Sequence, residues 1–258
     1  MKPLIYSCLF VLMIVFQANA QTDTLAFNKS DAQGKKQGSW QKKHPNGKIR
    51  YSGQFLNDIP VGEFRYFFSN GKLNAIVNHK GNGIHASTSV FNEAGDTTAK
   101  GFYFSQQKDS IWNYYDKNHK IISTELYHKG LANGCWVLYY PGDTLAAEKT
   151  SYKNGKKQGD FIQYFSNGSI KVKGQYQNDI LSGVYRSYYP DGKALNEGRY
   201  TDGLADGLWK YYTNDGRLKR EEWLKKGELL KEEIYIPDEP IVDKPLDPSL
   251  DPEKNEGF

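Results

Sequence analysis

Histidines, one cysteine in the body of the chain and several glutamates are the residues that could perform acid–base, nucleophilic or metal chemistry. His79 and His85 lie close in sequence, but no Cys, Asp or Glu completes a metal-ligand spacing with them. Cys135 stands between a glycine and Trp136, with no His and Asn/Asp arrangement to activate a thiolate. The glutamates of the predicted return strands are scattered and form no obvious facing pair of the kind that glycoside hydrolysis needs: Glu125, Glu148, Glu197, Glu221 and Glu222. Because the chain also lacks a glycine-rich phosphate-binding motif, we expect a non-enzymatic protein with no metal and no cofactor.

Aromatic residues are the other chemically distinctive group, with 19 Tyr, 13 Phe and 5 Trp among 258 residues. They recur at fixed distances from a small residue that opens a unit of 24 residues, and one unit has 25. The eight units open at Gly38, Gly62, Ala86, Ser110, Gly134, Gly159, Gly183 and Gly207. A fixed period of this length is the signature of a repeat architecture. The additional residue of the 25-residue unit is expected between Leu145 and Tyr152.

Three columns of this repeat are aromatic in most units. Two places after the opening residue stand Trp40, Phe64, Thr88, Trp112, Trp136, Phe161, Tyr185 and Trp209. Five places after it stand Lys43, Phe67, Phe91, Tyr115, Tyr139, Tyr164, Tyr188 and Tyr212, and a third column runs from Phe55 to Leu224. Most of these rings must form the core, but Tyr and Trp are also good anchors for a partner. We take four members of the first column as partner-binding candidates: Trp112, Trp136, Tyr185 and Trp209.

Each unit is predicted to form a β-hairpin. In the seventh unit, residues 184–189 are rich in strand-forming residues, Asp191-Gly192 is a turn signal, and residues 193–200 form the return strand. A single hairpin is marginal in water, so stacking of neighbouring units must supply the stability. The predicted fold is therefore all-β, an elongated single-layer antiparallel meander of about eight hairpins.

Spacing within the unit also predicts how side chains are distributed over the two faces of the sheet. The columns two and five places after the opening residue differ by an odd number, so they point to opposite faces. Four glycines share one column of the return strand: Gly53, Gly101, Gly174 and Gly198. They are predicted to mark a kink or a place where a ring lies over bare backbone.

The order of Gly-x-aromatic, an aromatic pair, Asn/Asp-Gly-Lys, Tyr and a Gly-rich joint resembles the MORN repeat. It is most similar to the bacterial MORN variant of the YwqK-family antitoxins, and residues 159–168 and 207–216 carry the pattern best. The resemblance covers residues 34–231. Middle units depart from it, because Ala86 and Ser110 replace the opening Gly, Thr88 the aromatic residue, and His119 and Asp143 the turn Gly. What the resemblance implies is a hairpin ribbon that contacts proteins or membrane surfaces.

The flanks differ in composition from the repeats. Residues 1–20 carry Lys2, an apolar run too short to span a bilayer and the Ala18-Asn19-Ala20 pattern of a signal peptidase site, which predicts a secretory signal peptide cleaved near Ala20. Residues 21–33 are predicted to form an N-terminal cap, and residues 34–236 the repeat domain. Residues 237–258 are rich in Pro and acids, which predicts a disordered tail. The mean hydropathy of −0.73 excludes a polytopic membrane protein.

Basic residues recur just after the first turn of the unit, at Lys48, Lys72, Lys120, Lys193 and Arg217. Because the period is structural, these charges are expected to line one edge of the ribbon, where they could attract anionic lipid or an envelope polymer. The alternative interpretation is that turn lysines keep the ribbon soluble and protect its sheet edges from mispairing.

Together these features predict a non-enzymatic binding or scaffold protein that is secreted or resides in the periplasm or cell envelope of a bacterium. It would contact an unknown protein partner through an aromatic-lined repeat surface. One alternative is a peripheral lipid or envelope-glycan binder that uses the basic edge. A second is an antitoxin or immunity protein of the YwqK type. Nucleic acid is not expected as a partner, since a secreted protein rarely meets it, and the sequence leaves the oligomeric state open.

Overall fold

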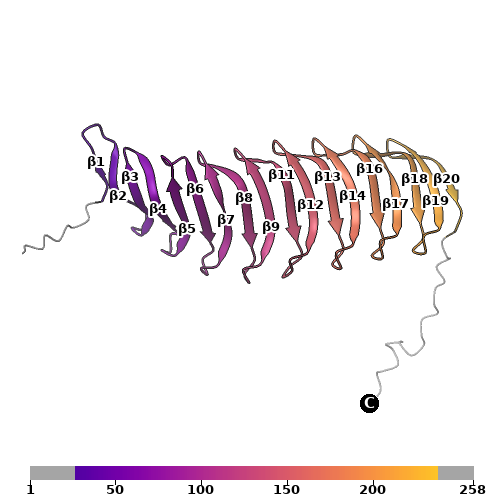
Figure 1. Cartoon of the computed structure of the whole chain (residues 1–258), viewed down its shortest axis with the longest axis horizontal. Coiled ribbons are helices and arrows are strands. Elements are labelled where there is room, and N and C mark those ends of the chain that lie inside the picture. Colours follow the sequence, from indigo (N-terminus) through magenta and orange to yellow (C-terminus); the bar gives the residue numbers. More distant parts are fainter. Residues whose placement is uncertain (1–26, 238–258) are drawn as a thin grey trace, which may run out of the picture.

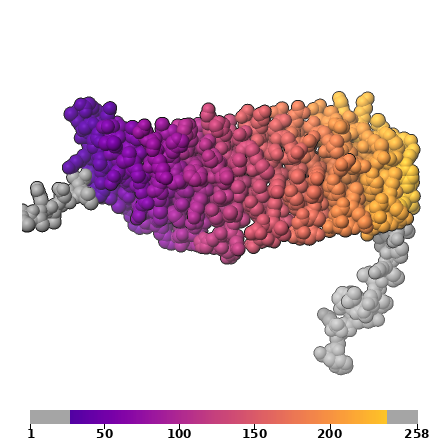
Figure 2. Space-filling model, in the orientation of Figure 1, coloured from indigo at the N-terminus to yellow at the C-terminus, as the bar shows by residue number. Residues whose placement is uncertain are grey.

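The structure, a computed structural model, describes residues 27–237, and these form one open antiparallel sheet of 20 strands without helices. Figure 1 shows the hairpins side by side along a long axis, with β1 (Lys29–Ser30) and β20 (Glu228–Ile234) at opposite ends. The space-filling view shows the same elongated body (Figure 2). The predicted all-β meander is therefore confirmed.

The strands follow one another in the sheet in chain order. Their bounds are β2 Lys36–Lys43, β3 Ile49–Leu56, β4 Ile59–Phe67, β5 Leu73–Lys80, β6 His85–Phe91, β7 Thr97–Phe104, β8 Gln107–Tyr115, β9 Ile121–His128, β10 Leu131–Ala132, β11 Gly134–Tyr139, β12 Ala146–Lys153, β13 Lys156–Tyr164, β14 Ile170–Gln177, β15 Ile180–Leu181, β16 Gly183–Tyr188, β17 Ala194–Thr201, β18 Leu204–Tyr212 and β19 Leu218–Lys225. β10 and β11 both pair with β9, and β15 and β16 both pair with β14, so each of these couples is one interrupted strand.

Two kinds of turn join the strands. The first turn of a unit ends in a left-handed residue, as at Gly192 with φ 89°, which is why glycine follows Asp or Asn there. The connection to the next unit has two residues in most units, and both are left-handed, as at Asn178 (φ 50°) and Asp179 (φ 72°). This is the type I′ geometry, whose twist matches that of the flanking strands.

The opening residue of the unit produces a β-bulge. Gly62 and Gly207 have φ values of 66° and 78°, and the pairing with the preceding strand shifts register opposite each of them. Ser110 adopts the same conformation, with φ 59°. The third unit is different, because Ala86 pairs with His79 in a register without a shift. Where glycine is replaced by Ala86, the bulge is therefore missing.

The core lies on one face of the sheet, which we call the ring face because it carries the aromatic column two places after the opening residue. Phe64, Trp112 and Trp209 are buried there, and rings from neighbouring strands stand edge-on against them. The other face, which we call the open face, carries Val184 and Tyr188, which line one hollow together. The prediction that the two aromatic columns point to opposite faces is confirmed.

The glycine column of the return strand lies directly under these rings, as predicted. A Cβ atom at Gly101 would come closer than 3.0 Å to the indole of Trp112, which belongs to the next strand of the sheet. Gly198 is covered by Trp209 in the same way. Gly174 differs only in that its ring, Phe161, comes from the preceding strand. Bare backbone at this column lets each large ring lie flat against the sheet.

One detail of the predicted register is wrong. The additional residue of the fifth unit lies in the first turn. There the amide of Tyr140 donates to the carbonyl of Leu145, five residues further on. In the sixth unit the equivalent bond, from Phe165 to Ser169, spans four residues. The additional residue therefore precedes Leu145 instead of following it. A turn absorbs an insertion at low cost, whereas an extra residue in the return strand would reverse every following side chain.

The ends of the repeat array are built differently. β1 pairs with β2, and the carboxylate of Asp31 accepts hydrogen bonds from the amides of Gln33 and Lys35. At the other end, β20 pairs with β19 and supplies the first strand of a ninth unit. The predicted signal peptide (1–20) and most of the predicted acidic tail (237–258) lie outside the described residues. Within residues 27–237 no helix is long and apolar enough to cross a membrane.

Candidate functional site

The structure divides the four predicted partner anchors into two groups. Trp112 and Trp209 are only 2% and 4% exposed, so their rings belong to the core and offer a partner almost no surface. Trp136 and Tyr185 are half-buried. The Trp136 indole N–H donates to the carbonyl of Leu126, so even this ring is held in place by its own sheet. This corrects the choice of Trp112 and Trp209, whose rings are buried because each lies directly on a glycine of the neighbouring strand, Gly101 and Gly198.

Apolar side chains that could contact a partner lie on the open face instead. Val184 is 46% exposed and Leu208 38%, and both stand one place after the opening residue of their unit. Ile111 occupies the same column in the fourth unit, and Phe102 is exposed on the neighbouring return strand. None of these exposed apolar residues was among the predicted site residues. The signal was available, since the residue next to a buried ring in a strand must point to the other face.

Two hollows lie side by side on the open face between the sixth and eighth units. They have volumes of about 350 and 280 Å³, and Val184 and Arg186 line both of them. Ion pairs border this region, with Arg186 at 3.0 Å from Glu197 and Lys210 at 3.3 Å from Glu221. Apolar and charged side chains are thus mixed around these hollows, with Arg186 lining both, and Arg is enriched in protein-binding surfaces.

On the ring face, lysines of three units lie over aromatic rings, and the most complete of these lysine cages is in the fourth unit. The Lys108 ammonium lies 4.5 Å from the ring centre of Trp112, 5.2 Å from Tyr114 and 4.9 Å from Tyr127, and it donates a 2.5 Å hydrogen bond to the Tyr114 hydroxyl. Lys36 and Lys157 lie over rings of the first and sixth units. All three lysines stand two places before the opening residue of their unit. The attraction between an ammonium and a ring face stabilises such an arrangement.

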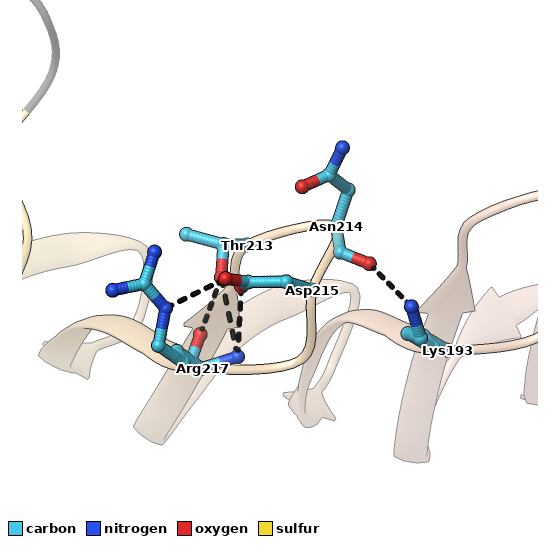
Figure 3. A network of polar contacts seen from close by, with 5 residues as sticks. All are labelled: Lys193, Thr213, Asn214, Asp215 and Arg217. Carbon is cyan, nitrogen blue, oxygen red and sulfur yellow. Dashed lines mark hydrogen bonds and ion pairs between the residues drawn. The ribbon is translucent and has the colours of Figure 1, made fainter.

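The predicted basic edge has a structural use. Lys48, Lys72 and Lys193 each donate to a backbone carbonyl in the first turn of the next unit, at 2.7, 2.6 and 3.0 Å. Figure 3 shows one of these links, from Lys193 to Asn214, beside the ion pair of Arg217 with Asp215 at 2.7 Å. Lys193 also forms an ion pair with Asp191, and the hydrogen bonds of its backbone amide and then of its ammonium lower the pKa of that carboxyl. Part of the edge charge is therefore neutralised within the chain.

Replacing these turn lysines is expected to have small effects. Lys48→Met, Lys72→Met and Lys193→Met should each lower the free energy of unfolding by less than about 1 kcal/mol, because the bonds are exposed to water. Urea denaturation of the three single variants and of the wild type measures the difference. A loss of several kcal/mol from any single variant would contradict this interpretation.

The residues that could do chemistry are not brought together. Among residues 27–237, no three His, Cys, Asp or Glu side chains lie close enough to hold a metal ion. Cys135 is an exposed free thiol. Burial lowers the pKa of His79, whose Nδ1 is buried without a hydrogen-bond partner. The polar groups of the ring face instead bond to one another, as in the hydrogen bond of 2.7 Å from the Tyr127 hydroxyl to Glu125.

These features define an elongated hairpin-repeat protein with one packed face and one open face. Four stretches of the sequence match the family model of the MORN repeat variant, namely residues 36–57, 60–80, 157–178 and 181–202. Four of its eight units are therefore repeats of the MORN variant, namely the first, second, sixth and seventh. The middle units, which lack some of the consensus residues, are not among the matches.

Other comparisons add little. No curated protein matches the sequence. Among solved structures, the crystal structure of TarM is similar at 10% sequence identity and a TM-score of 0.24, over 46% of this chain and 20% of TarM. The chain thus spans about a fifth of that protein's length, and a likeness at this TM-score carries no argument about fold or function.

Proposed function

We propose that this hairpin-repeat protein is a non-enzymatic scaffold that binds another protein through its open face. The repeats support a binding or scaffold role in general. The observation that carries the finer proposal is the surface around Val184 and Leu208, where exposed apolar side chains line two hollows together with Arg186 and Lys210. The column of Val184 and Leu208 also carries the exposed Ile111, but it is polar in the first, second, third and sixth units, so the apolar contact surface is confined to part of the open face.

We place this scaffold in the cell envelope or outside the cell, on the strength of the sequence pattern of residues 1–20. Binding of anionic lipid or glycan through the turn lysines is the second candidate, and the internal bonds of Lys48, Lys72 and Lys193 make it the weaker one. An antitoxin role has no feature of the structure in its favour.

A pull-down from envelope extract tests the proposal, with the chain from Gln21 to Phe258 as bait at low and high salt. The wild type is expected to retain a specific protein in both conditions. Val184→Glu/Leu208→Glu should reduce its retention at least tenfold, because two carboxylates would be buried in the interface.

Leu230→Glu is the matched control, since Leu230 is 64% exposed on the last strand, away from these hollows. Circular dichroism of each bait verifies that the sheet is retained. Equal retention by the wild type and the double variant would contradict the choice of surface. Recovery of only lipid or polymer, removed by salt, would favour the basic edge instead.

A further inference from the structure

The lysine cages of the ring face have an unfilled counterpart in the second unit. In the fourth unit, Lys108 lies over three rings, which stand two, four and 17 places after the opening residue. The second unit carries Phe64, Tyr66 and His79 in these three columns. At the column of the lysine it carries Pro60, which has no ammonium to place over the rings.

A cleft of about 670 Å³ occupies this place. Its lining includes Pro60 and all three cage rings, Phe64, Tyr66 and His79. Tyr51 adds a further ring, whose centre lies 5.9 Å from that of Tyr66. The columns that hold an ammonium in the fourth unit thus line a cleft in the second, where Phe64 is only 2% exposed and Tyr51, Tyr66 and His79 supply the accessible rings.

The cleft is open because the following unit is irregular. Its connecting loop has four residues, 81–84, where most units have two, and this loop lies against Ile59 and Pro60 at one rim of the cleft. The third unit also places Thr88 where other units carry a ring. A smaller side chain and a longer loop leave the rings of Tyr51, Tyr66 and His79 partly exposed at the cleft.

Charge at the cleft suits a cation. Asp58 lines the cleft. In the first unit the column of Pro60 carries Lys36, whose ammonium lies over Trp40 and Phe55 of its own unit. Burial lowers the pKa of His79, which leaves its ring neutral at pH 7. A neutral imidazole offers a ring face to an ammonium, and it does not repel the charge.

We propose that this cleft binds a lysine side chain of a partner protein. The chain itself places a lysine of this column over three rings in the fourth unit, over two in the first and over one in the sixth, so an alkyl stem and an ammonium match such rings in shape and charge. The proposal rests on the proposed function for the existence of a protein partner, and it adds the chemistry of one contact on the opposite face of the sheet.

The site can be tested without the partner, with Nα-acetyl-lysine methylamide as the probe and the norleucine analogue as its neutral control. Saturation-transfer NMR on the chain from Gln21 to Phe258 should show binding of the lysine probe at least tenfold tighter than that of norleucine. Pro60→Lys should abolish the binding, because the new side chain would fill the cleft as Lys108 fills its cage. Pro60→Ala, which leaves the cleft open, should retain it.

Lys108→Ala provides the converse test, since it empties a cage and should add a second site for the probe. Thermal unfolding of each variant verifies that the fold is retained. Equal binding of both probes, no binding of the lysine probe, or unchanged binding by Pro60→Lys would overturn the proposal. If the probe binds but no protein is retained in the pull-down, the cage stands and the proposed scaffold function fails. If a protein is retained but the probe does not bind, only the cage is wrong.

Discussion

Gly101→Ala is expected to lower the free energy of unfolding by about 3 kcal/mol, although it adds a single methyl group. Alanine is compatible with the strand backbone at this position, because Gly101 does not have a left-handed φ. The added Cβ would instead overlap the indole of Trp112, which is 2% exposed and cannot move toward solvent without losing its packing. Its N–H bond of 2.9 Å to the carbonyl of Phe102 would be lost with it. Urea denaturation followed by circular dichroism measures the change.

A double-mutant cycle with Trp112→Ala identifies the cause. Trp112→Ala alone should cost about 3–5 kcal/mol, as a large ring is removed from the core. In that background Gly101→Ala should cost little, because its methyl group then occupies space that the ring has vacated. The coupling between the two positions is therefore expected to reach about 2 kcal/mol. Additive effects would show that Gly101 is required for a reason other than the ring.

The fold was predictable from the sequence to a large extent, because its determinants are local and are repeated eight times. Asp191-Gly192 predicts a turn whose φ of 89° suits glycine, and the odd spacing of the two aromatic columns predicts their opposite faces. The glycine column predicted rings over bare backbone, as found at Gly101 and Gly198. Each of these inferences needs only the alternation of side chains in a strand and the conformational range of glycine.

The candidate site was less predictable, because it depends on which of two similar rings is covered. Trp112 and Trp136 stand in the same column, yet Trp112 lies on Gly101, whereas the corresponding residue before Trp136 is Glu125. Glycine permits close packing of the ring, and the larger glutamate side chain does not. Reading the ring column together with the column of the preceding return strand would therefore have distinguished the buried Trp112 from the half-buried Trp136. The cleft of the second unit was beyond such reasoning, since it depends on the course of the loop at 81–84 in space.

Stability is expected to fall steeply as the pH rises from 10 to about 12. Burial, with a hydrogen bond to Glu222, raises the pKa of Tyr211 to about 12, and burial with a hydrogen bond to Glu197 does the same for Tyr212. Burial also raises the pKa of Tyr127. An unfolded tyrosine ionises near pH 10, so these phenols stabilise the folded state fully below pH 10 and lose that contribution as the pH passes their folded-state pKa.

Tyr211→Phe/Tyr212→Phe separates this effect from the titration of lysines in the same range. The variant should be less stable at neutral pH, because it lacks two hydrogen bonds to carboxylates, at 2.8 and 2.9 Å. Between pH 10 and 12, however, its free energy of unfolding should fall less steeply than that of the wild type, since phenylalanine cannot ionise. Urea denaturation across this range, with phenolate absorbance recorded in parallel, gives both slopes. Parallel curves for the two proteins would mean that deprotonation of lysines, with loss of their cation–ring contacts, causes the alkaline unfolding instead.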